Sequence, residues 1–181
     1  MGVTITDNSG AFLARLTEAV DGSGGGLDAA TQFLADKMAQ SMYTSGAAGI
    51  PNDTPTKLQP PSAPGTPPSV KSTGLVGSIT NARVGTLRWA AGTNKEYAKI
   101  HEFGGVINHP GGTAYIMIDG TKFQPVHNRN AKPWMKRTKP HAINMPARPF
   151  MRPALRNNKA ALGRVFAARV RQLMNAAGGA A

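Results

Sequence analysis

The chain has 181 residues, no cysteine and a formal net charge of +12, with 21 glycines, 14 prolines and only 6% aromatic residues. The absence of cysteine excludes disulfides and cysteine-based zinc sites, and no apolar run approaches the roughly 20 residues that a membrane helix needs. The first residues lack the basic start and apolar core of a signal peptide, so we expect neither export by that route nor a membrane partner.

Residues 1–45 predict a helical segment. Apolar side chains from Phe12 to Val20 recur at helical spacing behind Asp7-Asn8-Ser9, whose side chains can cap a helix. The glycine-rich run 21–26 separates this helix from a second one at about 27–43, and no Gly-Lys-Ser/Thr follows to make it a phosphate loop. One side of the second helix is apolar and suits a core or a subunit interface: Leu27, Ala30, Leu34, Met38 and Met42.

Residues 46–71 hold seven prolines and few apolar side chains, which excludes a helix or a central strand. We expect an extended loop that becomes ordered against neighbouring subunits on assembly. Beyond it, residues 72–181 predict an α+β core. Its first elements are strands at 79–84 and 87–91, which flank Gly85-Thr86 and predict a hairpin.

Residues 97–107 predict a short helix. Tyr97, Ile100, Phe103 and Val106 recur at every third position and predict one buried face. Gly104-Gly105 ends the helix, because glycine adopts the left-handed conformation at little cost.

A second hairpin is predicted within residues 108–145. Strands at 114–118 and 121–126 flank Asp119-Gly120, a preferred type I′ turn. A basic loop containing Trp134 follows, and residues 141–145 predict a fifth strand.

The chain ends in a basic helix opened by the proline-rich residues 146–153, since proline is tolerated in a first helical turn. All nine acidic residues lie at or before Asp119. Residues 1–119, with eight basic side chains, therefore carry −1, and residues 120–181, with thirteen and no acid, carry +13. This asymmetry predicts a negatively charged partner, either nucleic acid or an acidic protein surface, and a solvated basic face is the alternative. The helix's predicted buried stripe is Leu155, Leu162, Val165, Phe166, Val170 and Leu173, and its basic residues are Arg152, Arg156, Lys159, Arg164, Arg169 and Arg171.

The sequence offers no set of catalytic or cofactor-binding residues. His101-Glu102 lacks the second histidine four residues on that a metalloprotease helix requires, and the other histidines, at 109, 127 and 141, form no ligand motif. No nucleophile elbow is present, and carboxylates are too sparse to predict a pair. We expect no enzyme, no metal and no cofactor.

Several short pieces of the chain resemble the phage virion morphogenesis family, which includes the G protein of phage Mu, and more distantly the tail-completion or neck proteins of long-tailed phages. The pieces are Pro64-Gly65-Thr66-Pro67-Pro68, Thr73-Gly74-Leu75, Tyr97-Ala98 with His101-Glu102-Phe103-Gly104-Gly105, and Pro146-Ala147-Arg148-Pro149-Phe150. The resemblance covers about residue 60 to the last helix. Residues 108–145 depart from the shorter neck proteins as an insertion.

The resemblance implies a virion protein at the head–tail interface, assembled in the host cytoplasm as a ring, commonly sixfold. Its partners would be the head connector and the tail-terminator or tail-tube proteins, and DNA would pass through the ring without specific binding. A tail terminator or another connector-layer protein is the alternative. The implied fold is α+β, with N-terminal helices and a C-terminal helix on an antiparallel sheet of four to five strands.

Two sets of side chains are candidates for partner contacts. Arg148, held between two prolines, suits a structural or intersubunit contact, with Glu102 as one possible partner and solvent as the alternative. A basic nucleic-acid-binding protein is the competing class, and salt-sensitive DNA binding would distinguish it. The interface candidates are Tyr97, His101, Glu102, Phe103, Arg148, Phe150, Arg152, Arg156 and Arg164, and the DNA-contact candidates are Lys132, Trp134, Lys136 and Arg137.

Overall fold

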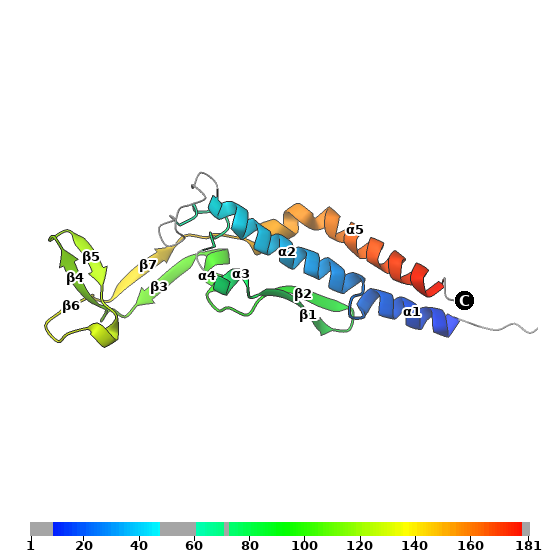
Figure 1. Ribbon diagram of the computed structural model, residues 1–181, viewed down its shortest axis with the longest axis horizontal. Helices are drawn as coiled ribbons and strands as arrows, with labels where there is room; N and C mark the ends of the chain where they lie inside the picture. The colour runs from blue at the N-terminus through cyan, green and yellow to red at the C-terminus, as the bar shows by residue number, and fades with distance from the viewer. Residues whose placement is uncertain (1–8, 48–60, 71–72, 179–181) are drawn as a thin grey trace, which may run out of the picture. The chain divides into compact units, whose positions relative to one another are not determined.

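The computed structural model describes residues 9–47, 61–70 and 73–178 (Figure 1). Helices and antiparallel strands both occur, which confirms the α+β class. The chain divides into two compact units: residues 104–146 form the second, and the remainder of the chain forms the first. The strands lie in three small antiparallel sheets of two, two and three strands, instead of the one sheet expected.

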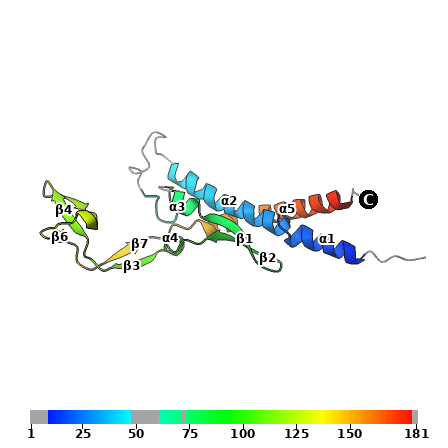
Figure 2. The ribbon, with the colours of Figure 1, turned by 60° about the horizontal axis from the view of Figure 1, so that its bottom comes forward.

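Three helices and a hairpin frame the first unit: α1 (Ser9–Asp21), α2 (Gly26–Ala47), α5 (Met151–Gly178), and the paired strands β1 (Ile79–Gly85) and β2 (Arg88–Thr93). Helix α2 lies between α5 and the hairpin and contacts both (Figure 1). Figure 2 shows the hairpin against α2 from another side. Helix α1 packs on α5 and α2.

The core of the first unit is small and collects side chains from distant parts of the sequence. Helix α2 supplies methionines one turn apart, and two short helices, α3 (Thr73–Val76) and α4 (Ala98–Phe103), supply the rest together with the start of α5. Phe150 has no exposed surface and is among the largest fully buried side chains described. The buried cluster is Met38, Met42, Leu75, Val76, Ala98, Phe150 and Ala154.

The first hairpin is confirmed, but its turn differs by one residue from the expected one. Gly85 pairs with Arg88, so the turn residues are Thr86 and Leu87, and Leu87 adopts φ 53°. Polar side chains fasten the hairpin to the helices. Asp21, at the end of α1, pairs with Arg83 and accepts the indole N–H of Trp89 at 3.0 Å.

The second unit contains β3 (Gly105–His109), which pairs with β7 (His141–Met145), and a sheet ordered β5-β4-β6. Strands β4 (Ala114–Ile118) and β5 (Lys122–Pro125) are the predicted second hairpin. Asp119 (φ 52°) and Gly120 (φ 69°) both adopt left-handed conformations, as a type I′ turn requires. The unit also contains η2 (Asn128–Asn130) and β6 (Lys136–Arg137).

The predicted buried face of the central helix is wrong. Helix α4 ends at Phe103, and Tyr97 and Phe103 are 46% and 60% exposed, while Val106 lies in strand β3. The helix buries Ala98 and Glu102 instead, which lie four residues apart on its other face. Gly104, at φ 70°, ends the helix as expected.

The ends of the other helices differ modestly from expectation. Helix α2 continues to Ala47, past the expected stop at Ser45-Gly46. Helix α5 begins at Met151, and Leu155 is 48% exposed, because the buried side of its first turn carries Ala154 instead. Within the proline-rich segment, residues 61–70 are described and contain no helix or strand. Residues 48–60 and 71, and the expected capping residues Asp7 and Asn8, lie outside the described residues. None of the described helices is long and apolar enough to cross a membrane.

Candidate functional site

A buried carboxylate stands at the end of α4. Glu102 is 2% exposed, and its Oε2 accepts the backbone N–H groups of Phe150 at 2.8 Å and Met151 at 2.9 Å. Its Oε1 accepts the N–H of Arg152 at 3.0 Å. The first N–H groups of a helix have no carbonyl partner within that helix, and a negative charge there is favoured by the helix dipole. Glu102 therefore caps α5 from a distant part of the sequence.

The side chain of Arg152 folds back over the same carboxylate. Its Nε donates to Glu102 Oε1 at 3.1 Å, and its Nη2 donates to the main-chain oxygen of Glu102 at 3.1 Å. The guanidinium also lies 4.6 Å from the ring centroid of Phe103, within range of a cation–π interaction. Arg152 thus holds the end of α4 against the start of α5 while much of its own side chain stays exposed.

The environment of Glu102 favours its charged form. Burial by itself raises the pKa of the carboxyl. The N–H groups of Met151, Arg152 and Phe150, together with the Arg152 guanidinium, lower it by more, so the pKa lies below its ordinary value. Glu102 is therefore a structural anion at neutral pH. It has no proton to give in general acid catalysis.

The segment that precedes α5 is anchored by its main chain. Arg148 donates its backbone N–H to His101 O at 2.6 Å and its Nε to the carbonyl of Ser62 at 2.8 Å. Gly65 N–H donates to Ala147 O at 2.8 Å. The suggested ion pair between Arg148 and Glu102 is wrong, because the amides that open α5 and Arg152 already occupy that carboxylate.

His101 lies beside this anchored segment. Its Nδ1 is buried and has no hydrogen-bond partner among the described residues, and its ring meets Tyr97 edge to face at 6.2 Å. Burial, and secondarily the charge of Arg148, lower the pKa of His101. We therefore assign His101 a neutral, structural role at neutral pH.

An open depression of about 580 Å³ lies next to the Glu102 cap. Its lining combines apolar side chains with charges of both signs, and includes Lys95, Lys99, Arg152, Glu96, Glu102, Phe103 and Met151. No nucleophile with an adjacent base lines it, and the described residues contain no cluster of three or more metal-ligating side chains.

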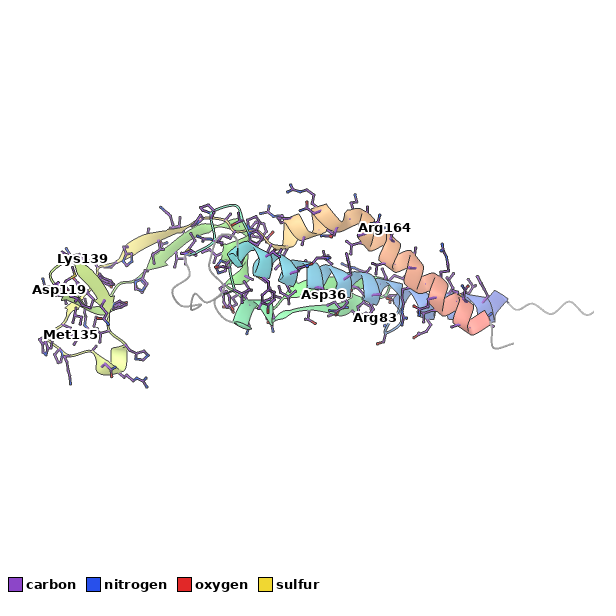
Figure 3. All side chains as sticks on the ribbon, turned by 45° about the horizontal axis from the view of Figure 1, so that its top comes forward. Asp36, Arg83, Asp119, Met135, Lys139 and Arg164 are labelled. Atoms are coloured by element: carbon purple, nitrogen blue, oxygen red, sulfur yellow. The ribbon has the colours of Figure 1, made fainter. Side chains whose placement is uncertain are left out.

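The interface candidates separate into buried and exposed groups. Phe150 and Glu102 are buried and present no surface to a partner in this conformation, which corrects their assignment. Tyr97, just before α4, and Phe103, at its last residue, are exposed, and the Arg152 guanidinium lies over the Phe103 ring. Arg156 and Arg164 are exposed on α5, where Figure 3 labels Arg164.

The DNA-contact candidates all lie in the second unit. Trp134 is 76% exposed in a turn closed by the Met135 N–H, which donates to Lys132 O at 3.1 Å. Lys136 and Arg137 form the short strand β6, and Arg137 Nη1 donates to Gly112 O at 2.8 Å.

The local sequence did not identify α5 as the partner of Glu102, because that helix begins 49 residues later. The role of Asp21 was not predicted, since Asp21-Gly22 indicated only the end of a helix. Its carboxylate is 3% exposed, and a hydrogen bond from Arg83 is the main cause that lowers its pKa.

Comparison of the chain with protein-family models, with curated proteins and with solved structures gives no match.

Proposed function

We propose that this protein is a structural virion component of a tailed phage, forming a ring at the head–tail junction that joins the head connector to the tail. The observation that carries the proposal is the convergence, within the first unit, of the pieces that resemble the phage family. Gly65 bonds to Ala147, Arg148 bonds to His101, and Glu102 caps the helix after Phe150. Pieces spread over more than 80 residues thus lie at one junction of the first unit, which supports treating them as one structural feature.

The distribution of apolar surface supports a protein that works against neighbouring subunits. The core cluster is small, whereas large apolar side chains are exposed on α1, α2, the hairpin and the end of α4. In this proposal, neighbouring subunits cover these apolar groups on assembly. They include Phe12, Leu13, Tyr43, Val84, Leu87, Tyr97 and Phe103.

In this proposal, the exposed basic side of α5 docks on an acidic protein surface of an adjacent ring. A lumen lined by so much positive charge would bind the phosphate backbone of passing DNA and oppose its ejection. Docking on protein uses the same charge to steer the encounter between layers. Arg169 and Arg152 are already engaged, since Arg169 Nε donates to Gly24 O at 2.7 Å and Arg152 binds Glu102. The side chains left for the partner are Arg156, Lys159, Arg164 and Arg171.

The test is to count and locate the protein in purified phage particles. Quantitative mass spectrometry should find a few copies per particle, consistent with a single ring, and cryo-electron microscopy should find them at the neck. Hundreds of copies per particle would exclude a single-ring role. In a deletion mutant, full heads beside complete tails would support a neck protein, whereas tails of uncontrolled length would support the alternative tail terminator.

A further inference from the structure

One face of the β5-β4-β6 sheet carries an aromatic pair. Met117 lies opposite Phe123, and Tyr115 lies opposite Pro125 on one side and Lys136 on the other. Directly opposed residues project from the same face of a sheet. The rings of Tyr115 and Phe123 are 4.8 Å apart at an interplanar angle of 35°. Phe123 is 53% and Met117 45% exposed, so this face is open among the described residues.

The unit that carries this face has a positive net charge. Residues 104–146 contain six lysines and arginines and a single acidic residue, Asp119, a net charge of +5. Neither ion pair found among the described residues lies in this unit. Lys136 projects beside the aromatic pair, and the unit's other large exposed ring, Trp134, follows Lys132 in the turn where Figure 3 labels Met135.

We propose that the Tyr115–Phe123 face binds single-stranded nucleic acid. Unpaired bases stack on exposed aromatic rings whatever their sequence, while lysine and arginine side chains pair with the phosphates. The face supplies both parts: Tyr115 and Phe123 form the platform, and Lys136 lies one strand away. This inference stands on the second unit alone and does not depend on the proposed role at the head–tail junction.

The geometry favours single strands over the other anionic partners. Duplex DNA keeps its bases paired and stacked inside the helix, so their faces are not available to the exposed Tyr115–Phe123 pair, whereas the faces of unpaired bases are. An acidic protein surface would use the lysines but would gain no base stacking from the Tyr115–Phe123 pair. Stacking on the Tyr115–Phe123 pair therefore favours a single-stranded nucleic acid as the partner.

The experiment measures binding of the full chain to a fluorescent oligothymidine of roughly 16 nucleotides, an upper site size for such surfaces, and to a duplex of equal length. Anisotropy titrations run between about 50 and 200 mM salt, the range in which phosphate contacts weaken steeply. Loss of one stacked base costs about 1–3 kcal/mol, so Phe123→Ala should weaken oligothymidine binding roughly 5- to 150-fold. Lys136→Glu should also weaken it and flatten the salt dependence.

Matched controls lie in the first unit. Phe12→Ala removes a ring of similar exposure from α1, and Arg88→Glu reverses an exposed charge; both should leave binding unchanged. Far-ultraviolet circular dichroism verifies that each variant is folded. Preference for the single strand together with a selective loss in Phe123→Ala supports the proposal. Equal affinity for duplex with no effect of Phe123→Ala overturns it in favour of general attraction to polyanions. Absence of binding at about 50 mM salt also overturns it and leaves an acidic protein as the partner.

Discussion

Removing the Glu102 carboxylate should destabilise the first unit more than any exposed substitution. Glu102→Ala would leave the amides of Phe150, Met151 and Arg152 without their acceptor and would remove the partner of the Arg152 guanidinium. A buried donor left unpaired costs about 1–3 kcal/mol, and three donors lose their acceptor here; losing the ion pair adds little, because the Arg152 side chain is 63% exposed. Water can reach part of the opened site, so we expect a loss of about 3–5 kcal/mol. That is a large share of the roughly 5–15 kcal/mol typical of a folded domain.

The assay is thermal and urea unfolding followed by circular dichroism. At about 2–4 °C per kcal/mol for a chain of this size, Glu102→Ala should lower Tm by roughly 6–20 °C. Glu102→Gln retains one acceptor but places an amide donor against the helix N–H groups, so it should also destabilise, though less. Glu96→Gln, an exposed change two residues before α4, is the control and should stay within about 0.5 kcal/mol of the parent.

Hydrogen exchange gives the local readout for the same variants. In Glu102→Ala, the amides of residues 150–152 should exchange faster than those in the middle of α5. The pKa of Glu102 is lowered in the folded state, so its contribution is present above the ordinary value of 4.5 and disappears as pH falls through the folded value. Unchanged Tm together with unchanged protection of these amides would refute the capping role.

The pKa of His101 is lowered in the folded protein, so as the pH falls the unfolded chain takes up this proton before the folded chain does, and stability should fall below about pH 6.5. His101→Gln should flatten this pH dependence of Tm, and the exposed control His127→Gln should not. Asp21→Asn should lower stability and shift the fluorescence of Trp89 to longer wavelength, and an unshifted spectrum would contradict its anchoring role. Charge reversal at Arg156 and Arg164 together should leave full heads and separate tails; normal joining with abnormal DNA ejection would place α5 in the channel instead.

Local signals in the sequence were sufficient for elements that fold on local contacts. The Asp119-Gly120 turn fixes the hairpin of β4 and β5, because both residues tolerate positive φ and the flanking strands are adjacent in sequence. Helix α2 follows from apolar spacing over many residues, and its methionines 38 and 42 are buried as their period requires. The α+β class follows from these elements together.

The elements that the sequence did not predict correctly depend on contacts between distant residues. Strand β3 was not predicted, because its partner β7 lies more than 30 residues away and no turn residues near 105–109 indicate a hairpin. The spacing of Tyr97 and Phe103 gave the correct helix but the wrong buried face, because a six-residue helix has too few positions to show which side packs. That side was set by Glu102, whose buried carboxylate accepts three backbone amides from a distant segment of the chain.

Arg148 binds a carbonyl, as its rigid segment predicted, but it does not bind Glu102. Two flanking prolines correctly indicated a side chain held ready for a carbonyl or carboxylate, and its Nε does bind the carbonyl of Ser62. The choice of Glu102 as partner failed because a carboxylate with three amides from one helix end already has its accepting sites filled, and Arg152 approaches from the same helix. The sequence spacing of these residues could not show that other donors occupy the Glu102 carboxylate.

The Glu102 cap also bears on the proposed docking surface of α5. The carboxylate fixes the first turn of α5, and the direction of the helix fixes where Arg156 and Arg164 are presented. A change at Glu102 should therefore weaken head–tail joining without altering any charge on the docking surface. If docking depended on net charge alone, Glu102→Gln, which makes the chain more positive, would leave joining intact. Reduced joining in that variant, at a temperature where it remains folded, would show that the orientation of α5 matters and not merely its charge.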